Sequence, residues 1–413
     1  MEAKDWYNGF VKSFDKTSDL RVALVYDRLN KWGGAERVLL ALHKLFPDAP
    51  LYTSVYDANK APWAKVFKVR TSFLQNFPFT IHHELYATLM PIAFESFSSK
   101  GGFDEFDLVI SVTSEGAKGI ITKPKTKHVC YCLTPTRYLW SGYDEYFKNP
   151  VLRFLSKPVV TYLKFWDRIA AQRPDAFIAI SKEVQGRIKK YYGRESEIVY
   201  PPLGLDGRKW KVEDGNSKID NRRSIDLQSS TLKNLSSTVY HPSSYFLIVS
   251  RLVPYKKIDL AIKTFNKLKL PLKIIGIGSE RRKLKAMAKP NIEFLGYLTD
   301  KELVRYYSSC RALVFPGIED FGLTILEAQS FGKPVIAFKA GGALETIIEG
   351  KTGLFFDEST VESLSLVIKE FGNMNFDPKD CIEQASKFSF EIFKKQFMRE
   401  ILRLMPQDDI KKI

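Results

Sequence analysis

Two glutamates, Glu319 and Glu327, lie eight positions apart where a strand is expected to lead into a helix. The apolar run Ala312–Phe315 predicts a buried strand, and Pro316-Gly317 ends it. A carboxylate accepts two hydrogen bonds, which matches the vicinal diol of a ribose or a pyranose. The spacing therefore favours a ligand with sugars on both sides of a diphosphate, with Glu327 on the ribose and Glu319 on the other sugar.

The start of the expected helix could bind the diphosphate itself. Free N–H groups and the positive end of the helix dipole attract anions there, and Gly322 would let a ligand come close to the backbone. The candidate phosphate-binding amides are those of Phe321, Gly322, Leu323 and Thr324. The alternative is that both glutamates are ordinary surface acids near a helix start, where the dipole favours them.

Basic residues follow another expected strand, at 246–250. Arg251 and Lys256 lie just beyond the end of this strand. Two cations near a helix dipole suit a diphosphate leaving group, because they stabilise the negative charge that develops on it. The alternative is that both are solvated surface bases.

Glycine turns follow two further expected strands. Gly33 and Gly34 separate the strand Val22–Tyr26 from an amphipathic helix at 35–46, and Gly276 and Gly278 follow the strand Leu272–Ile275. Glycines at the carboxyl end of a parallel sheet permit close approach of a ligand. Each turn could equally be a tight turn without a ligand.

Strands alternate with helices in both halves of the 413 residues, and the segment Val159–Arg173 is expected to form an amphipathic helix. This order predicts an α/β chain of two Rossmann-like, doubly wound parallel-sheet domains that face each other across a cleft. The expected parts are an N-terminal acceptor-side domain at 1–205 with an extra arm at 1–20, a polar linker or insertion at 206–244, a nucleotide-sugar domain at 245–385, and a C-terminal helix at 386–413 that braces the N-terminal domain.

The order of motifs in the second half resembles that of a known family. The spacing of Glu319 and Glu327 is followed by GKPVIA, GGALETI and GKTGLFF. Together these resemble the signature of the retaining glycosyltransferases of family 4, which have the two-domain GT-B fold. The resemblance extends over about residues 20–404, and it is specific because several motifs occur in the family's order.

This resemblance implies a metal-independent hexosyltransferase that uses a nucleotide sugar, either GDP-mannose or a UDP-hexose. Glu319 would position the sugar, while Arg251 and Lys256 would stabilise the departing phosphate. The donor phosphate itself would help to take the acceptor's proton. The resemblance implies no cofactor, and no Asp-x-Asp sequence here reads as a metal site.

The resemblance also assigns roles to the glycine turns and to the segment between the domains. The loop at Gly33-Gly34 would face the donor phosphate and the acceptor, and the Gly276–Gly278 turn would surround the nucleobase together with the loop at Tyr297. The segment 134–140 places Arg137 and Tyr138 as candidates on the acceptor side.

The chain departs from the family pattern at two positions. Leu133 stands where relatives carry a histidine that touches the donor sugar or assists near the reacting centre, so no catalytic histidine is assigned. His128, at the start of the same expected strand, is interpreted as structural. Lys257 stands where relatives often carry glycine.

Composition and charge limit the class of protein. The net charge of +16 fits phosphate-bearing ligands or an anionic membrane surface, and no zinc-finger spacing or RNA-binding aromatic motif supports a nucleic-acid partner. Four cysteines without metal spacing indicate a reducing compartment. With no apolar run of spanning length, the chain is expected in the cytoplasm, with possible peripheral contact at the membrane.

The acceptor is expected to be a glycan or a lipid-linked glycan. Basic residues beside aromatic ones at 65–97 would suit an interface with anionic lipid, or else helices that pack their aromatics inward. Two other functions fit the same motifs. One is a GT-B epimerase of sugar nucleotides, and the other is a non-catalytic partner subunit, which Leu133 in place of the histidine makes worth testing.

Overall fold

The computed structural model describes residues 20–77, 87–99, 101–147, 149–209 and 245–405. The expected N-terminal arm up to residue 19, most of the 206–244 linker and the last eight residues lie outside this part. The described chain forms two compact units, the first made of Met1–Tyr200 and Phe393–Ile413 and the second of Pro201–Ile392.

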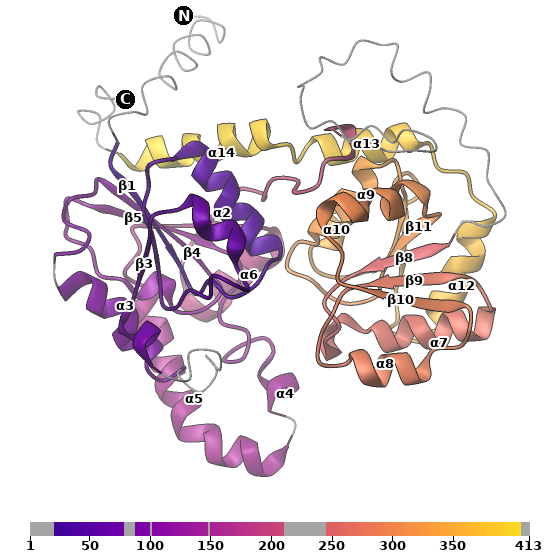
Figure 1. Cartoon of the computed structure of the whole chain (residues 1–413), viewed down its shortest axis with the longest axis horizontal. Helices are drawn as coiled ribbons and strands as arrows, with labels where there is room; N and C mark the ends of the chain where they lie inside the picture. Colours follow the sequence, from indigo (N-terminus) through magenta and orange to yellow (C-terminus); the bar gives the residue numbers. More distant parts are fainter. Residues whose placement is uncertain (1–19, 78–86, 100, 148, 210–244, 406–413) are drawn as a thin grey trace, which may run out of the picture. The chain divides into compact units, whose positions relative to one another are not determined.

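The first unit is built around a parallel sheet with helices on both faces (Figure 1). Its elements, in chain order, are β1 (Val22–Tyr26), α2 (Gly34–Leu45), β2 (Leu51–Thr53), η2 (Pro62–Val66), β3 (Val69–Thr71), η3 (Phe73–Asn76), α3 (Met90–Ser99), β4 (Leu108–Thr113), η5 (Ala117–Gly119), β5 (Lys127–Cys132), α4 (Tyr143–Tyr146), α5 (Pro150–Ala170), β6 (Ala176–Ala179), α6 (Lys182–Tyr192), β7 (Glu197–Ile198) and most of α14 (Phe390–Leu404).

The strand order in this sheet is β3-β2-β1-β4-β5-β6-β7, and each neighbouring pair is parallel. All residues of β1 and β4 are buried, as expected for strands covered on both faces. The chain winds outward from β1 in one direction and then returns to start again at β4. The loops after β1 and β4 therefore meet at the point where the winding reverses, where α/β sheets bind ligands.

The second unit repeats this plan with a second parallel sheet. Its elements are η6 (Gly207–Lys209), β8 (Phe246–Val249), η7 (Pro254–Lys256), α7 (Ile258–Leu268), β9 (Leu272–Ile275), α8 (Arg281–Met287), β10 (Ile292–Gly296), α9 (Asp300–Ser309), β11 (Ala312–Phe315), α10 (Leu323–Ser330), β12 (Val335–Phe338), α11 (Ala343–Thr346), β13 (Gly353–Phe356), α12 (Val361–Gly372) and α13 (Pro378–Ser386).

Here the strand order is β10-β9-β8-β11-β12-β13, again parallel throughout. Side chains of β8 alternate between two apolar clusters: Phe246 and Ile248 belong to the cluster with α7 and α12, and Leu247 to the cluster with α9 and α10. The winding reverses between β8 and β11. The prediction of two Rossmann-like parallel-sheet domains is confirmed.

Several predicted element bounds agree with the structure, and one helix differs. The strands Val22–Tyr26, Leu272–Ile275 and Ala312–Phe315 have the expected ends. Helix α5 was expected from residue 159, but it begins at Pro150 and continues through Pro158. A proline inside a helix lacks one backbone donor and usually indicates a helix end, which is why the first nine residues were missed.

The C-terminal helix α14 packs on the first unit's sheet. Phe393 and Phe397 contact the ring of Tyr131 on β5 in edge-on geometry, and Arg403 forms an ion pair with Glu197. Among the described residues, no helix is both long and apolar enough to span a bilayer.

Candidate functional site

The loops after β8 and β11 bring the residues expected to do chemistry in the second unit together. Lys256 follows β8, Glu319 follows β11, and the Lys256 Nζ and Glu319 Oε1 atoms form an ion pair. Their side chains retain 14% and 17% exposure, so the pair is accessible from solvent. Two residues 63 positions apart therefore meet because β8 and β11 are neighbours in the sheet.

Arg251, the second residue after β8, extends the same basic group. Its guanidinium donates a hydrogen bond to the Tyr255 hydroxyl at 2.6 Å while remaining exposed. The Lys256 ammonium lies 5.2 Å from the centre of the same tyrosine ring. The loop after β8 thus carries two cations held beside one aromatic side chain.

Glycines allow the loops around Glu319 to pack backbone against backbone. A Cβ atom on Gly317 would lie 2.7 Å from the Tyr255 carbonyl oxygen, and one on Gly342 would lie 2.2 Å from the Phe321 Cα atom. The Gly342 amide also donates to the Glu319 carbonyl at 2.9 Å. These contacts fix the backbone that carries Glu319, and they explain why the GGALETI motif begins with two glycines.

The Gly276–Gly278 turn is packed on the loop that follows β8. A Cβ atom on Gly276, whose φ is 138°, would lie 1.8 Å from the Ser250 carbonyl oxygen, and one on Gly278 would lie 2.3 Å from that of Leu252. Tight backbone packing therefore requires both glycines. Tyr297, after β10, is exposed, and the contact of this region with a nucleobase stays a prediction.

Helix α10 begins where the anion-binding amides were expected. Gly322 is its N-cap with a φ of 91°, a left-handed conformation that favours glycine. The N–H groups of the first turn have no partner within the helix, apart from the Ile325 amide, which bonds the Gly322 carbonyl at 3.0 Å. Phe321 is buried and packs edge-on against Phe388, which anchors the start of the helix.

Glu327 is buried on α10, so the alternative that both glutamates are surface acids is wrong for this one. Its Oε2 atom accepts a hydrogen bond of 2.8 Å from the Tyr307 hydroxyl on α9. A buried carboxylate is retained only where hydrogen bonds compensate for its lost hydration. Tyr307 therefore fixes the orientation of Glu327, and this partner was not anticipated from sequence.

Lys257 adopts a left-handed conformation, with a φ of 52°, directly before α7. This conformation explains why glycine suits the position in relatives, because it costs a residue with a side chain more free energy. Lys257 is thus a third basic residue in this loop, beside Arg251 and Lys256.

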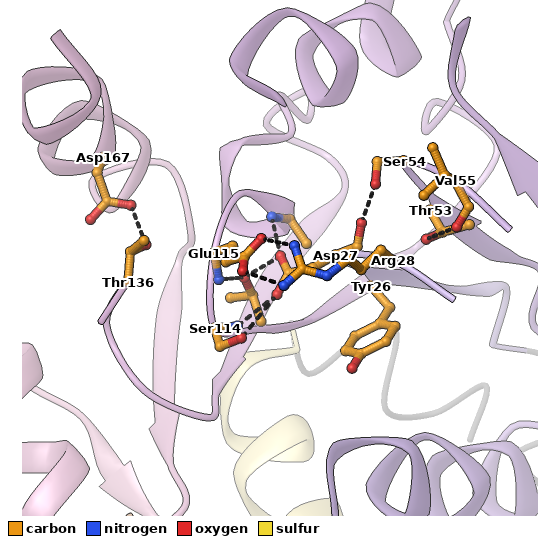
Figure 2. Close-up of polar contacts among 12 residues, drawn as sticks. Tyr26, Asp27, Arg28, Thr53, Ser54, Val55, Ser114, Glu115, Thr136 and Asp167 are labelled. Carbon is orange, nitrogen blue, oxygen red and sulfur yellow. Dashed lines mark hydrogen bonds and ion pairs between the residues drawn. The ribbon is translucent and has the colours of Figure 1, made fainter. Parts of the chain in front are cut away.

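The corresponding loops of the first unit are joined by a buried carboxylate (Figure 2). Asp27, directly after β1, accepts hydrogen bonds from the Thr113 hydroxyl at 2.7 Å and from the Ser114 and Ala117 amides at 2.7 and 2.9 Å. Burial raises the pKa of Asp27, and the nearby Glu115 carboxylate raises it further, whereas these hydrogen bonds oppose the rise. Asp27 thus ties the loop after β1 to the loop after β4.

A second pair links the same two loops. The Arg28 guanidinium forms two hydrogen bonds with the Glu115 carboxylate at 2.5 and 2.6 Å, and the two side chains face each other in Figure 2. Gly33 and Gly34 lie at the start of α2, where the φ of Gly33 is 177°, an extended conformation open to any residue. Their predicted contact with the donor and acceptor stays a prediction.

The segment that carries Arg137 and Tyr138 is held by Asp167 of α5, a residue that sequence reasoning missed. Asp167 is fully buried and pairs with Lys118 at 2.5 Å. It also accepts hydrogen bonds from the hydroxyls of Thr136 and Tyr192 and from the Trp140 indole, at 2.7–3.0 Å. The only sequence signal was a single acid within a basic, apolar helix.

The candidate acceptor residues lie beside this network. Burial first, and then Glu115 and Asp167, raise the pKa of Tyr138 well above its ordinary value, so its hydroxyl stays protonated. Leu133, at the position of the family's histidine, is buried. His128 is buried as well, and its Nε2 atom lies 2.8 Å from the Ser111 hydroxyl, which fits the expected structural role. Among the described residues, no cluster of three metal-binding side chains is found.

Comparison with known proteins agrees with this geometry. Residues 235–388 match the family Glycosyl transferases group 1. This match is narrower than the expected resemblance over residues 20–404, and it covers the unit that carries the Lys256–Glu319 pair.

Curated relatives have low identity to this chain. A GDP-mannose-dependent monoacylated alpha-(1-6)-phosphatidylinositol monomannoside mannosyltransferase of Corynebacterium glutamicum is 29% identical over 48% of this chain and 52% of its own length. The O-antigen chain mannosyltransferase C of Escherichia coli is 28% identical over 56% of this chain and 57% of its own. The chain spans about half the length of the curated relatives it matches.

The structural likeness extends further along the chain. The structure of Anabaena HepE in complex with UDP and glucose has a TM-score of 0.66, with 20% identity over 94% of this chain and 100% of the other. At this identity the likeness concerns the fold, and it includes the first unit, which the family match does not reach. The chain therefore has the GT-B fold of two parallel-sheet domains, and residues 235–388 in its second unit are similar to the Glycosyl transferases group 1 family.

Proposed function

We propose that this protein transfers a hexose, with retention of anomeric configuration, from a nucleotide sugar to a hydroxyl of a glycan or lipid-linked glycan. One observation carries the proposal: Lys256 and Glu319 meet at the reversal point between β8 and β11, just before the first turn of α10. A cation, a carboxylate and a helix start with free amides are the three groups that a sugar diphosphate needs.

The cations act on the leaving group. Arg251, Lys256 and the first amides of α10 bind the diphosphate, and they stabilise the charge it gains when the bond to the anomeric carbon breaks. The acceptor oxygen bonds to the anomeric carbon on the same face of the sugar ring from which the phosphate departs. The proton of the acceptor hydroxyl passes to an oxygen of the departing phosphate. No protein base is then required on that face, which suits a chain with Leu133 where relatives carry histidine.

The two glutamates position the sugars at either end of the diphosphate. Glu319 accepts hydrogen bonds from hydroxyls of the transferred hexose once the donor displaces its contact with Lys256. Glu327 accepts from the ribose, in an orientation that Tyr307 fixes. The Gly276–Gly278 turn and Tyr297 surround the base, while the Gly33-Gly34 loop, Arg137 and Tyr138 serve the acceptor side.

Mannose from GDP-mannose is the first donor to test. The Corynebacterium relative is named for GDP-mannose and a phosphatidylinositol-linked acceptor, and the Escherichia coli relative for mannose transfer to O-antigen chains. The HepE structure holds UDP, so a UDP-hexose is the second candidate.

The decisive experiment measures thermal stabilisation of the purified protein by GDP, UDP, ADP and their sugar conjugates. A ligand that binds the folded state raises Tm by mass action, by an amount equivalent to about 2.7 kcal/mol at a hundredfold excess over Kd. We expect one base to stabilise the protein and one conjugate to exceed its free nucleotide. Turnover of that conjugate is then followed with glycan and polyprenyl-linked acceptors.

Two outcomes would favour the alternatives. Release of nucleotide with an altered free sugar, without any acceptor, would identify an epimerase. If no nucleotide stabilised the protein, the proposed donor site would be contradicted. That result would favour a non-catalytic partner subunit, the alternative suggested by Leu133 in place of the family's histidine.

A further inference from the structure

Helix α5 exposes an unusually large apolar surface. Seven of its apolar side chains are between 41% and 76% exposed, and they are Val151, Phe154, Leu155, Val159, Tyr162, Phe165 and Ile169. Single exposed apolar residues are normal on protein surfaces, but a continuous set on one helix marks an interaction site. Figure 1 shows α5 extending away from the sheet of the first unit.

These residues form a second face of the helix, separate from the one that packs inward. Val160, Leu163 and Ala170 are buried, together with Asp167. At 3.6 residues per turn these four positions fall on one side of the helix. The exposed set centred on Phe154, Tyr162 and Phe165 falls on roughly the opposite side, so the fold's own core does not account for it.

Basic side chains border the exposed apolar face. Arg153, Lys157, Lys164 and Arg168 fall on a common edge between the exposed and buried faces. Asp167, the one acid of α5, is buried and paired with Lys118, so it does not offset this charge at the surface. Arg153 pairs with Asp144 of α4, whose carboxylate is itself highly exposed.

Two of these cations are held at the helix surface by aromatic rings. The Lys164 ammonium lies 4.7 Å from the centre of the Tyr143 ring, and the Arg168 guanidinium lies 4.9 Å from that of Trp140. This support keeps both charges beside the helix instead of extended into solvent. The edge therefore places positive charge along the apolar face, with Lys164 and Arg168 held close to the helix.

We infer that α5 docks the protein on an anionic lipid bilayer, with Phe154, Leu155, Tyr162 and Phe165 inserted among the headgroups. A basic edge beside a broad apolar face on one long helix is the arrangement that interfacial helices use. The basic edge selects anionic lipid, because each Lys or Arg near such a surface contributes about 1 kcal/mol of attraction. A protein partner with an acidic, apolar groove is an outcome that the test below distinguishes.

The α5 surface lies outside the stretch 65–97, where the sequence left an interface with lipid open. In that stretch Phe94 is buried, Phe73 and Phe77 are 37% and 41% exposed, and residues 78–86 lie outside the described part, so the expectation there stays a prediction. The inference rests on the proposed function only in suggesting that the acceptor is carried by lipid. Binding to a bilayer needs neither donor nor acceptor.

The test is co-sedimentation of the full chain with vesicles of phosphatidylcholine alone and of phosphatidylcholine with phosphatidylglycerol. We expect binding to the anionic vesicles that weakens as salt is added. Replacing two exposed apolar residues in the variant Leu155→Ser/Phe165→Ser should lower partitioning about tenfold or more, since each loses an inserted side chain. Lys157→Glu should lower it about tenfold on anionic vesicles alone.

Matched controls come from α12 of the other unit. Leu366 is 66% exposed, the same as Phe165, and Lys369 lies on the same helix. Leu366→Ser and Lys369→Glu should leave partitioning unchanged. Because every substituted residue in the test and control variants lies at the surface, thermal melts should show all of them folded.

Three results would overturn the inference: no sedimentation with either vesicle, equal losses in the α5 and α12 variants, or a dimer that Phe165→Ser dissociates while vesicle binding is absent. Nucleotide binding, measured in the same preparations without vesicles, separates the two proposals. If α5 binds lipid but no nucleotide stabilises the protein, the proposed function fails and this inference stands. If a nucleotide stabilises the protein but α5 does not bind lipid, the proposed function stands and this inference fails.

Discussion

The two sheets reverse their winding in the same way, but their loops at that point are held by different means. In the first unit, Asp27 and the Arg28–Glu115 pair join the loops through buried or half-buried hydrogen bonds. In the second unit, glycines let the loop backbones pack directly, and the Lys256–Glu319 pair stays partly exposed. The two ion pairs are about equally exposed, with 13% and 15% for Arg28 and Glu115 and 14% and 17% for Lys256 and Glu319. The units differ instead in how the loops are joined, by the buried carboxylate of Asp27 in the first unit and by backbone packing at glycines in the second.

The difference separates stability from ligand binding. Asp27 would lose its buried hydrogen bonds if it turned to a ligand, so this carboxylate is suited to fixing loops. In the second unit, glycine-mediated backbone packing fixes the loops, and the partly exposed Lys256 and Glu319 can exchange their mutual contact for contacts with a substrate. Substitutions in the two places should therefore have different consequences.

Glu319→Ala should produce the largest effect. Turnover should fall by about 10²–10³, the loss typical for one group that stabilises the transition state. Nucleotide affinity should change little, because this carboxylate is assigned to the sugar. Lys256→Ala should reduce both nucleotide affinity and turnover, and calorimetric titration with the free nucleotide distinguishes the two variants. Equal losses of affinity would contradict the assigned roles.

Asp27→Ala should destabilise the first unit instead of altering donor binding. It leaves the Thr113 hydroxyl and the Ser114 and Ala117 amides without their acceptor, and each buried unsatisfied donor costs about 1–3 kcal/mol. We expect a loss of about 3 kcal/mol or more in the free energy of unfolding, measured by urea titration. If nucleotide affinity fell as strongly as stability in this variant, Asp27 would also contribute to donor binding, and the prediction would be wrong.

Acid should weaken the first unit before the second. Burial first, and then the nearby charges of Arg173 and Arg194, lower the pKa of His128 to about 3. Below about pH 6.5 the unfolded chain binds a proton that the folded chain does not, so stability falls as pH falls through that window toward 3. The loss should reach about 2 kcal/mol between about pH 7.5 and about pH 5.

Tryptophan fluorescence suits this measurement. Of the six tryptophans, Trp32, Trp63, Trp140 and Trp166 lie in the described part of the first unit; Trp6 and Trp210 lie outside the described residues and are replaced by phenylalanine for this measurement. His128→Gln should flatten the dependence of stability on pH, whatever its effect on stability at neutral pH. An unchanged slope in this variant would show that other groups dominate.

A pair of glycine substitutions tests the smallest effect. A methyl group on Gly342 would lie 2.2 Å from the Phe321 Cα atom, so Gly342→Ala must displace the loop that carries Glu319. On Gly33 it would lie 3.1 Å from a carboxylate oxygen of Glu36, the end of a flexible side chain. We expect Gly342→Ala to weaken donor affinity about tenfold, about 1.4 kcal/mol. Gly33→Ala should have little effect on it.

Sequence patterns predicted much of the fold because strand signals depend on local chemistry. Buried parallel strands are short apolar runs, and three of them were placed to the residue. The start of α5 was missed because Pro158 resembles a helix end, and tertiary context kept the helix intact through it. The exposed apolar face of α5 was not anticipated, since apolar periodicity does not say which face of a helix is covered.

The motifs determined which residues are candidates for the site, since charge, hydroxyl-binding capacity and glycine content are properties of residue type. The tertiary structure decided which of them meet. Lys256 and Glu319 are paired because β8 and β11 are adjacent, Tyr307 orients Glu327 from another helix, and Asp167 gathers its partners from three other segments of the chain. Such contacts join residues far apart in sequence, and only the order of strands in the sheet and the packing of helices on it bring them together.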